Sequence, residues 1–241
     1  RMPDEILVVN NGDEPVLLSC DFSDKAIVTV VDAIRRAGAS QARNIGAAIA
    51  TGDYLAFLDD DDLWSSEYLA NIDTAIQRSG ACCVVSRLDK LRDGNIIPYK
   101  NIAHSFTVAA LLVANPGITG SNVVIKKSFF IIMGGFDVML PTSNDKSFAI
   151  ELLLRGCSVE TLQQNQAISR EHGETKLTLP AKSAIGVQRF IEKYRALMSL
   201  EAYYVNKAKY HRFCFESGRT IAIFPRLFYS LLARLSRLFN L

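Results

Sequence analysis

The sequence predicts an α/β domain with a mixed, mainly parallel sheet flanked by helices, followed by a helical tail. Short apolar runs rich in β-branched residues recur along the first half of the chain, with helix-like stretches between several of them. The 241 residues, 49% of them hydrophobic, suffice for one large domain and an accessory segment. We therefore place the domain at residues 1–180 and the tail at residues 181–241.

The strands are predicted from short apolar runs. They are Ile6–Val9, Ile27–Val31, Tyr54–Leu58, Cys82–Ser86 and Gly120–Ile125. The triplet Asp93-Gly94-Asn95 is typical of a hairpin turn. A hairpin joins antiparallel strands, and so we expect the sheet to become mixed from this point.

The helices are predicted from capping residues, terminal glycines and apolar spacing. They are Ser40–Ala50, a helix after Trp64 capped by Ser65 or Ser66, Lys126–Met133, Asp145–Arg155, one or two helices within Ala184–Phe215, and Arg226–Leu238. The last of these lies in the predicted tail.

Composition favours a reducing, cytoplasmic setting. The five cysteines show no metal-ligand spacing, and a disulfide framework is normally denser and even in number. No apolar run reaches the roughly 18 residues of a membrane span, and no secretory signal opens the chain. The chain starts at Arg1 and soon enters a predicted strand, and so we expect that its true N-terminus is missing.

Charge is distributed unevenly along the chain. Residues 182–241 hold 11 Lys or Arg against 3 Glu, a surplus of +8, while the whole chain has a net charge of +2, which leaves −6 for the rest. An acidic main domain without a recognition motif argues against nucleic-acid binding.

The most informative feature is the acidic run Asp59–Asp62, which directly follows the predicted strand Tyr54–Leu58. Ligands of open α/β sheets bind beyond the carboxyl ends of strands. Carboxylates suit Mg²⁺ or Mn²⁺, which complete their shells with phosphate oxygens and water. The alternative is a solvated acidic loop that begins a helix. A calcium loop is only weakly supported, because the glycine and terminal glutamate of that 12-residue pattern are absent.

The acidic run lies within the stretch Gly52–Trp64, which is preceded by a second informative stretch, Gly38–Gly46. Together they resemble the central signature of glycosyltransferase family 2. The resemblance implies a GT-A fold, a nucleotide-diphosphate sugar donor and Mg²⁺ or Mn²⁺ held by an Asp-x-Asp motif at Asp59 and Asp61. It makes Asp61 the direct metal ligand and places Asp60 at the donor.

Other residues acquire expected roles from the same resemblance. Arg43 is expected near the nucleotide, with a surface arginine on an amphipathic helix as the alternative. Met133–Asp137, followed by Asn144-Asp145, resembles the family's Gly-Gly-Phe-Asp turn and its downstream acidic pair. This makes Asp145 the expected catalytic base, with a helix cap as the alternative.

Three further residues are expected near the sugar donor or the acceptor. Gly120 is expected to line the sugar pocket and Gly135 to form a tight turn near the acceptor, although ordinary turns would explain both. His172, in a stretch that resembles the family's Arg-x-His element, is expected near the metal or diphosphate, with a structural role as the alternative.

The chain departs from the family pattern near its start. Asn10-Asn11-Gly12-Asp13 stands where the family has an acidic pair, and so we expect the nucleobase contact from Asn10 or Asp13. The strand and helix that the family carries before this point are absent. If this absence is real, the sheet loses a central element and part of the nucleotide pocket, and we expect the isolated chain to be inactive or unstable.

The expected function is inverting transfer of a sugar to a saccharide or lipid-linked acceptor, in bacterial cell-surface polysaccharide or glycolipid synthesis. The alternative is a nucleotide-sugar-binding or scaffold protein of the same fold without turnover.

In the predicted tail helix, apolar residues from Phe228 to Phe239 share one face and Arg226, Arg234 and Arg237 lie opposite. This pattern favours an anionic membrane surface, with a peripheral position at the inner face of the plasma membrane, or a helix packed on the domain with solvated arginines.

Overall fold

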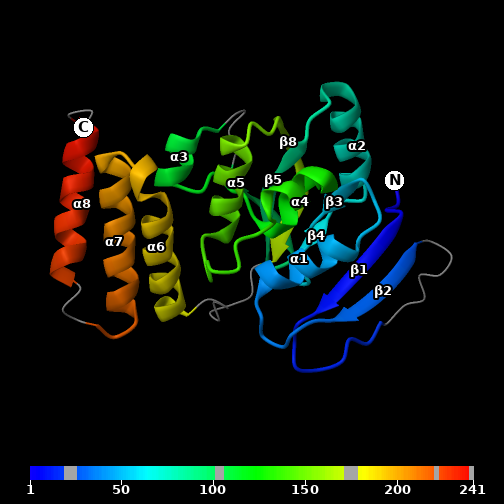
Figure 1. Ribbon diagram of the computed structural model, residues 1–241, viewed down its shortest axis with the longest axis horizontal. Coiled ribbons are helices and arrows are strands. Elements are labelled where there is room, and N and C mark those ends of the chain that lie inside the picture. The colour runs from blue at the N-terminus through cyan, green and yellow to red at the C-terminus, as the bar shows by residue number, and fades with distance from the viewer. Residues whose placement is uncertain (19–25, 101–105, 171–178, 220–222, 239–241) are drawn as a thin grey trace. The chain divides into compact units, whose positions relative to one another are not determined.

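Figure 1 shows a computed structural model of the chain, which describes residues 1–18, 26–100, 106–170, 179–219 and 223–238. The chain forms two compact units, each assembled from separate stretches. The first unit comprises residues 1–105, 116–138 and 151–171, and the second comprises residues 106–115, 139–150 and 172–241. The domain boundary near residue 180 stays a prediction.

The first unit contains all the described strands. Its elements are β1 (Glu5–Asn10), β2 (Ile27–Asp32), α1 (Ala39–Ile49), β3 (Tyr54–Ala56), β4 (Leu63–Trp64), α2 (Tyr68–Ser79), β5 (Cys83–Arg92), β6 (Asn95–Lys100), the 3-10 turn η1 (Gly120–Asn122), β7 (Val123–Lys126), α4 (Lys127–Met133) and β8 (Val159–Arg170). Helix α5 (Asn144–Leu154) begins in the second unit and ends in the first.

The strands form two sheets. β1 and β2 pair in parallel as a two-stranded sheet. The larger sheet has the order β3-β7-β5-β8-β4, and β6 pairs with β5. The predicted α/β fold with a mixed sheet is confirmed.

The balance of strand directions differs from the mainly parallel sheet that we predicted. Only the pairs β1–β2 and β5–β8 are parallel among the described strands, whereas β3–β7, β4–β8, β5–β6 and β5–β7 are antiparallel. The β5–β6 pair is a hairpin whose turn residues Asp93 and Gly94 have φ angles of 50° and 77°. A short hairpin can join only antiparallel strands.

Two local predictions need correction. Gly120–Asn122 is a 3-10 turn rather than the start of a strand, because Thr119 and Asn122 form a reciprocal capping box around it. Helix α2 begins at Tyr68, and its N-cap position is Glu67 rather than Ser65 or Ser66.

The hydrophobic core of the first unit packs α2 against the larger sheet. Tyr68 and Ile72 of α2 are buried together with Val84 and Leu88 of β5. Trp64 stacks on Tyr68 with ring centroids 4.4 Å apart. Full burial of an apolar side chain such as Ile72 contributes about 1.5–3 kcal/mol to the stability of the fold. This packing anchors the chain directly after the acidic run.

A second aromatic group lies on the other side of the acidic run in sequence. Phe57, just after β3, packs edge-on against Phe136 and is tilted against Phe130 of α4, each at 5.3 Å between centroids. All three rings are buried. Together with Trp64, they hold both flanks of the acidic run in the first unit.

The second unit is helical. Its elements are α3 (Val108–Val113), the first part of α5, α6 (Pro180–Tyr194), the 3-10 turn η2 (Arg195–Leu197), α7 (Leu200–Glu216) and α8 (Ile223–Leu238). Figure 1 shows α6, α7 and α8 side by side, and α7 contacts both of the others. Asn206 and Lys209 of α7 donate to the carbonyls of Leu112 and Val113, at 2.7 and 2.8 Å, and so satisfy the C-terminal end of α3. No helix within the described residues is long and apolar enough to span a membrane.

Candidate active site

The acidic run lies in a tight loop between β3 and β4. Phe57 extends the pairing of β3 by donating its backbone N–H to Val123 at 3.3 Å, and Asp62 donates its backbone N–H to Asp59 at 3.1 Å. The run therefore follows the end of a sheet strand, as predicted, and its first and last carboxylates belong to one turn.

Asp59 forms an ion pair with Arg43, which projects from α1. The Arg43 side chain is only 11% exposed, and its guanidinium lies over the Phe136 ring, 5.1 Å from the centroid. Arg43 is therefore not the surface arginine of the alternative prediction. Its charge is held against the acidic run.

Gly120 provides the space that Arg43 occupies. A Cβ at this position would collide with the Arg43 guanidinium, and so any larger residue would displace the arginine. We expected Gly120 to line the pocket of the donor sugar. The structure gives it a physical reason to be glycine, which is close approach of a side chain to its backbone.

Ser121 connects the two ends of the acidic run. Its hydroxyl accepts a hydrogen bond from the Asp59 backbone N–H at 3.1 Å and donates one to Asp62 Oδ2 at 2.6 Å. Its carbonyl accepts a hydrogen bond from the Trp64 indole at 2.7 Å. The sequence does not predict this role of Ser121, because each of these hydrogen bonds spans about sixty residues.

Asp62 is the most enclosed carboxylate of the run. The backbone N–H of Arg170 at the end of β8 donates to Asp62 Oδ1 at 3.2 Å. Burial raises the pKa of Asp62 above its usual value, and hydrogen bonds from Ser121 and Ser169 oppose that rise. Asp62 thus ties the loop to η1 and β8, while Asp60 is exposed and Asp61 half-buried.

The glycine pair after α4 lies against α1. Gly134 and Gly135 both have left-handed φ angles, 84° and 72°. Asn44 of α1 accepts from the Phe136 N–H at 2.9 Å and donates to the Phe136 carbonyl at 2.8 Å. A Cβ on Gly135 would meet Asn44 Oδ1 at 2.5 Å. The turn therefore requires glycine for both its conformation and its contact with α1.

Asn10 and Asp13 stand at the end of β1. Asn10 donates to Asp32 Oδ1 and to the Glu14 carbonyl, both at 3.0 Å, and accepts from the Gly12 N–H. Asp13 is paired with Arg36 at 2.5 Å. Both side chains thus organise the loop itself, and their contact to a nucleobase stays a prediction.

Asp145 belongs to the second unit, where it is the second residue of α5. Its backbone N–H donates to Asn144 Oδ1 at 3.0 Å, and its side chain is half-buried. The N-terminal end of a helix stabilises a carboxylate. Since α5 begins one residue earlier, Asp145 lies inside the first turn rather than at the cap.

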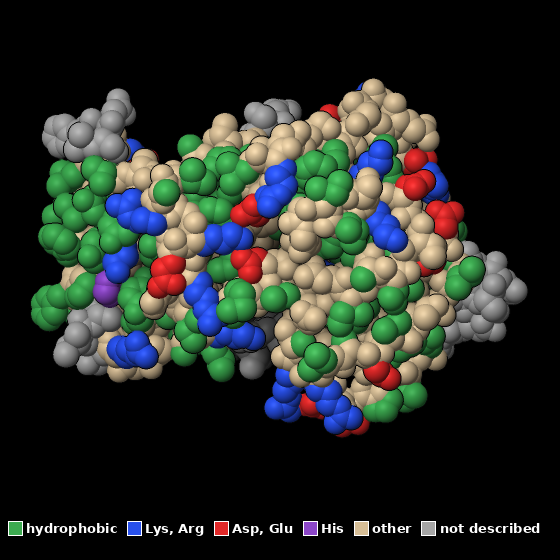
Figure 2. Space-filling model, in the orientation of Figure 1, with side chains coloured by type: hydrophobic (Ala, Val, Ile, Leu, Met, Phe, Trp, Pro, Cys, Tyr) green, Lys and Arg blue, Asp and Glu red, His purple; other side chains and the backbone are tan. Residues whose placement is uncertain are grey.

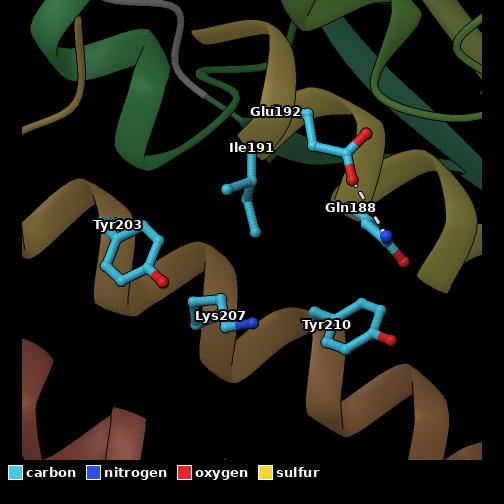
Figure 3. A pocket seen from close by; sticks show the side chains of 6 residues that line it. All are labelled: Gln188, Ile191, Glu192, Tyr203, Lys207 and Tyr210. Atoms are coloured by element: carbon cyan, nitrogen blue, oxygen red, sulfur yellow. Dashed lines mark hydrogen bonds between the residues drawn. The ribbon is translucent and has the colours of Figure 1, made fainter. Parts of the chain in front are cut away.

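The second unit also contains an open pocket of about 230 Å³ between α6 and α7. Figure 3 shows Ile191 and Glu192 of α6 opposite Tyr203 and Lys207 of α7. Gln188 donates to Glu192 at 2.9 Å along one wall. The predicted site residues are not among those that line this pocket.

Residues 1–135 match the model of a known family, glycosyl transferase family 2. The chain belongs to this family. The matched part contains Arg43 and the whole acidic run, whereas Asp145 lies beyond it. The family resemblance in the sequence is therefore confirmed.

One relative and two solved structures are similar to this family 2 chain. A protein of Haemophilus influenzae described as an uncharacterized glycosyltransferase is 27% identical over 154 residues, 62% of this chain and 52% of that protein. The match thus spans about half the length of that relative.

Staphylococcus aureus TarS 1-349 in complex with UDP-GlcNAc matches 97% of this chain and 82% of its own, with a TM-score of 0.59 and 12% identity. The structure of GalNAc-T7 with UDP, GalNAc and Mn²⁺ matches 86% of this chain and 44% of its own, with a TM-score of 0.58 and 17% identity. At such identities the likeness shows the fold alone, and the predicted GT-A fold is confirmed.

The family resemblance implied a divalent cation at the acidic run. Among the residues that the structure describes, no three His, Cys, Asp or Glu side chains form a metal-binding group. The carboxylates of the acidic run nevertheless suit Mg²⁺ or Mn²⁺ bound together with a diphosphate. Such ions take one or two protein carboxylates and complete their coordination shell with phosphate and water oxygens. His172, also expected near the metal, lies outside the described residues.

Proposed function

We propose that this chain is an inverting, metal-dependent glycosyltransferase that moves a sugar from a nucleotide-diphosphate donor to the hydroxyl of a saccharide or lipid-linked acceptor. The observation that carries the proposal is the acidic run at the end of β3, with Arg43 held against it, in a member of glycosyl transferase family 2. TarS and GalNAc-T7, which share the fold, have been crystallised with UDP or a UDP-sugar, which favours a nucleotide donor.

Asp61, together with Asp59, would hold the cation, and Asp60 would contact the donor. When bound, Mg²⁺ or Mn²⁺ supplies positive charge to the diphosphate leaving group. Arg43 adds a second positive charge at the same loop, and its exchange from Asp59 to a phosphate would couple donor binding to the acidic run.

Asp145 is the proposed base. The acceptor oxygen forms a bond to the anomeric carbon while the bond from that carbon to the diphosphate oxygen breaks. The leaving diphosphate takes the electron pair, and the Asp145 carboxylate takes the acceptor's proton. One displacement from the opposite face inverts the anomeric configuration.

Other proposed contacts concern the donor and the biological setting. Asn10 or Asp13 would contact the nucleobase, and Gly120, Gly135 and His172 would contribute to the donor and acceptor sites. The proposed setting is bacterial cell-surface polysaccharide or glycolipid synthesis in the cytoplasm. The peripheral position at a membrane depends on a different part of the chain, helix α8.

The direct test replaces Asp145 by Asn and measures release of nucleoside diphosphate from a panel of sugar nucleotides with Mn²⁺. We expect turnover by the wild type and a loss of about 10²–10⁴-fold in kcat in Asp145→Asn, because the variant cannot accept the proton. Glu151→Gln, which removes the same charge further along α5, is the matched control and should keep its turnover.

A nucleotide-sugar-binding protein without turnover is the second candidate. It is favoured by Asn10, an amide already engaged with Asp32 and Glu14 where the family has acid. Binding of sugar nucleotides without turnover by the wild type, or equal turnover by Asp145→Asn, would contradict the enzymatic proposal.

A further inference from the structure

Helix α8 turns its apolar face away from the helix on which it packs. Its exposed side chains follow helical spacing along its length: Phe224, Leu227, Phe228, Leu231, Leu235 and Leu238. Phe224 is 77% exposed and Leu238 76%, which is unusual for large apolar residues. The arrangement is the reverse of a tail helix that packs its apolar face on the protein, the second sequence-based interpretation.

The opposite face of α8 contacts α7 through an aromatic ring, two small residues and an arginine. Tyr229 stacks on His211 of α7 with ring centroids 5.4 Å apart and planes within 5°. Ala233 and Ser236 are buried, and Arg237 donates to Glu201 of α7 at 2.8 Å. These contacts fix the rotation of α8 about its axis, and so the exposure of the Phe and Leu side chains follows from specific packing.

All charged side chains of the segment that contains α8 are positive. Residues 217–241 include Arg219, Arg226, Arg234 and Arg237 and contain no Asp or Glu. Figure 2 shows apolar side chains gathered over α8, with Lys and Arg side chains beside them. An exposed apolar face, on a helix whose charged residues are all arginines, matches the chemistry of a bilayer interface with anionic headgroups.

We propose that the outward face of α8 binds an anionic lipid surface, with the Phe and Leu side chains among the acyl chains and Arg226 and Arg234 at the headgroups. The helix lies in the plane of the interface, in keeping with the absence of a membrane-spanning helix among the described residues. This proposal goes beyond the proposed sugar transfer and does not depend on it.

Charge also argues against a second copy of the chain as the occupant. A two-fold contact through this face would bring the arginines of two α8 helices together. Arg237 is already paired with Glu201, and residues 217–241 contain no acidic residue that could pair with Arg226 and Arg234 of the other copy. Lipid phosphates supply that missing negative charge.

The test is co-sedimentation of the full chain with vesicles of phosphatidylcholine alone or mixed with phosphatidylglycerol. We expect binding to the mixed vesicles that weakens on adding salt and is much weaker with phosphatidylcholine alone. A triple variant, Phe228→Ser with Leu231→Ser and Leu235→Ser, should lose about tenfold or more in affinity, because it removes buried apolar area. These side chains are exposed, and so the fold should survive.

Two matched controls separate this face from general effects. Ile185→Ser with Leu197→Ser removes exposed apolar side chains elsewhere in the second unit and should leave vesicle binding unchanged. Arg226→Gln with Arg234→Gln should weaken binding to the mixed vesicles, whereas Lys182→Gln should not.

Absence of vesicle binding by the wild type would overturn the proposal, as would undiminished binding by the triple serine variant. A wild-type dimer in light scattering that the same variant dissociates, without vesicle binding, would assign the face to a second copy and would also overturn it.

Discussion

Single charged side chains in both units are held by partners that lie far away in sequence. Arg43 reaches Asp59 and lies over Phe136, and it needs Gly120 for space. In the second unit, Lys146 is buried with its ammonium 3.5 Å from Asn206 Oδ1 and 3.7 Å from the centroid of the Phe190 ring. Each such residue has consequences that can be measured.

Lys146 should make stability depend on pH. Burial, and to a smaller extent the charge of Lys209, lowers its pKa from 10.5 to about 7. Between these two values the unfolded chain binds the proton and the folded chain does not, and so stability rises as pH rises. From pH 7 to pH 9 we expect this lysine to add about 1–2 kcal/mol to the free energy of unfolding.

Urea unfolding of the wild type and Lys146→Met at both pH values measures this contribution. The rise should disappear in Lys146→Met and remain in Lys182→Met, an exposed lysine on α6. Equal slopes in wild type and Lys146→Met would show that the lysine is solvated.

The sequence could predict which residues carry charge at the site but not their environment. The Gly52–Trp64 signature identified the acidic run, and the Gly38–Gly46 stretch identified Arg43. The burial of Arg43 depends on Phe136 and Gly120, which no local pattern links to it. The hydrogen bond from Ser121 to Asp62 could not be predicted either, because it joins segments that are distant in the sequence.

At the level of elements, Asn44 joins α1 to the turn after α4 by hydrogen bonds. Asn44 satisfies both the N–H and the carbonyl of Phe136. Gly46 on the same helix lies close to β1, where a Cβ would meet Val9 Cγ2 at 3.2 Å. Helix α1 thus packs close to a strand on one side and to the glycine turn through Asn44.

Asn44→Ala should lower the free energy of unfolding by about 1–3 kcal/mol, because it leaves backbone groups of Phe136 without their partner. Chemical denaturation measures the change. Ile49→Ala, at an exposed position of the same helix, is the control and should change stability far less. A loss in Asn44→Ala no greater than in Ile49→Ala would show that water replaces the asparagine.

The sequence predicted most elements, since their apolar patterns and terminal glycines are local. It missed β4, which is two residues long, and β8, whose sequence Val-Glu-Thr-Leu-Gln-Gln is largely polar. Both strands exist through pairing, β4 with β8 and β8 with β5. The strand directions likewise depend on which strands meet, and this the local pattern does not contain.

At the scale of the whole molecule, the chain combines an acidic part with a basic helical part. The family match covers Arg43 and the acidic run, and the outward-facing α8 lies in the basic part. The charge difference between the two parts could be read from the sequence. The direction in which the apolar face of α8 points could not, because it depends on the packing of α8 on α7. Donor binding and membrane binding are therefore separate proposals, which separate variants test.

We propose that the acidic run binds a nucleotide diphosphate together with a divalent cation. Isothermal titration calorimetry with UDP, and then GDP and CDP, with and without Mn²⁺, tests it most directly. We predict binding by the wild type that Mn²⁺ strengthens about tenfold or more, loss of this strengthening in Asp61→Asn, and its retention in Asp53→Asn, an exposed carboxylate just before β3. Binding that is equal with and without Mn²⁺, or an undiminished effect of Mn²⁺ in Asp61→Asn, would contradict the account.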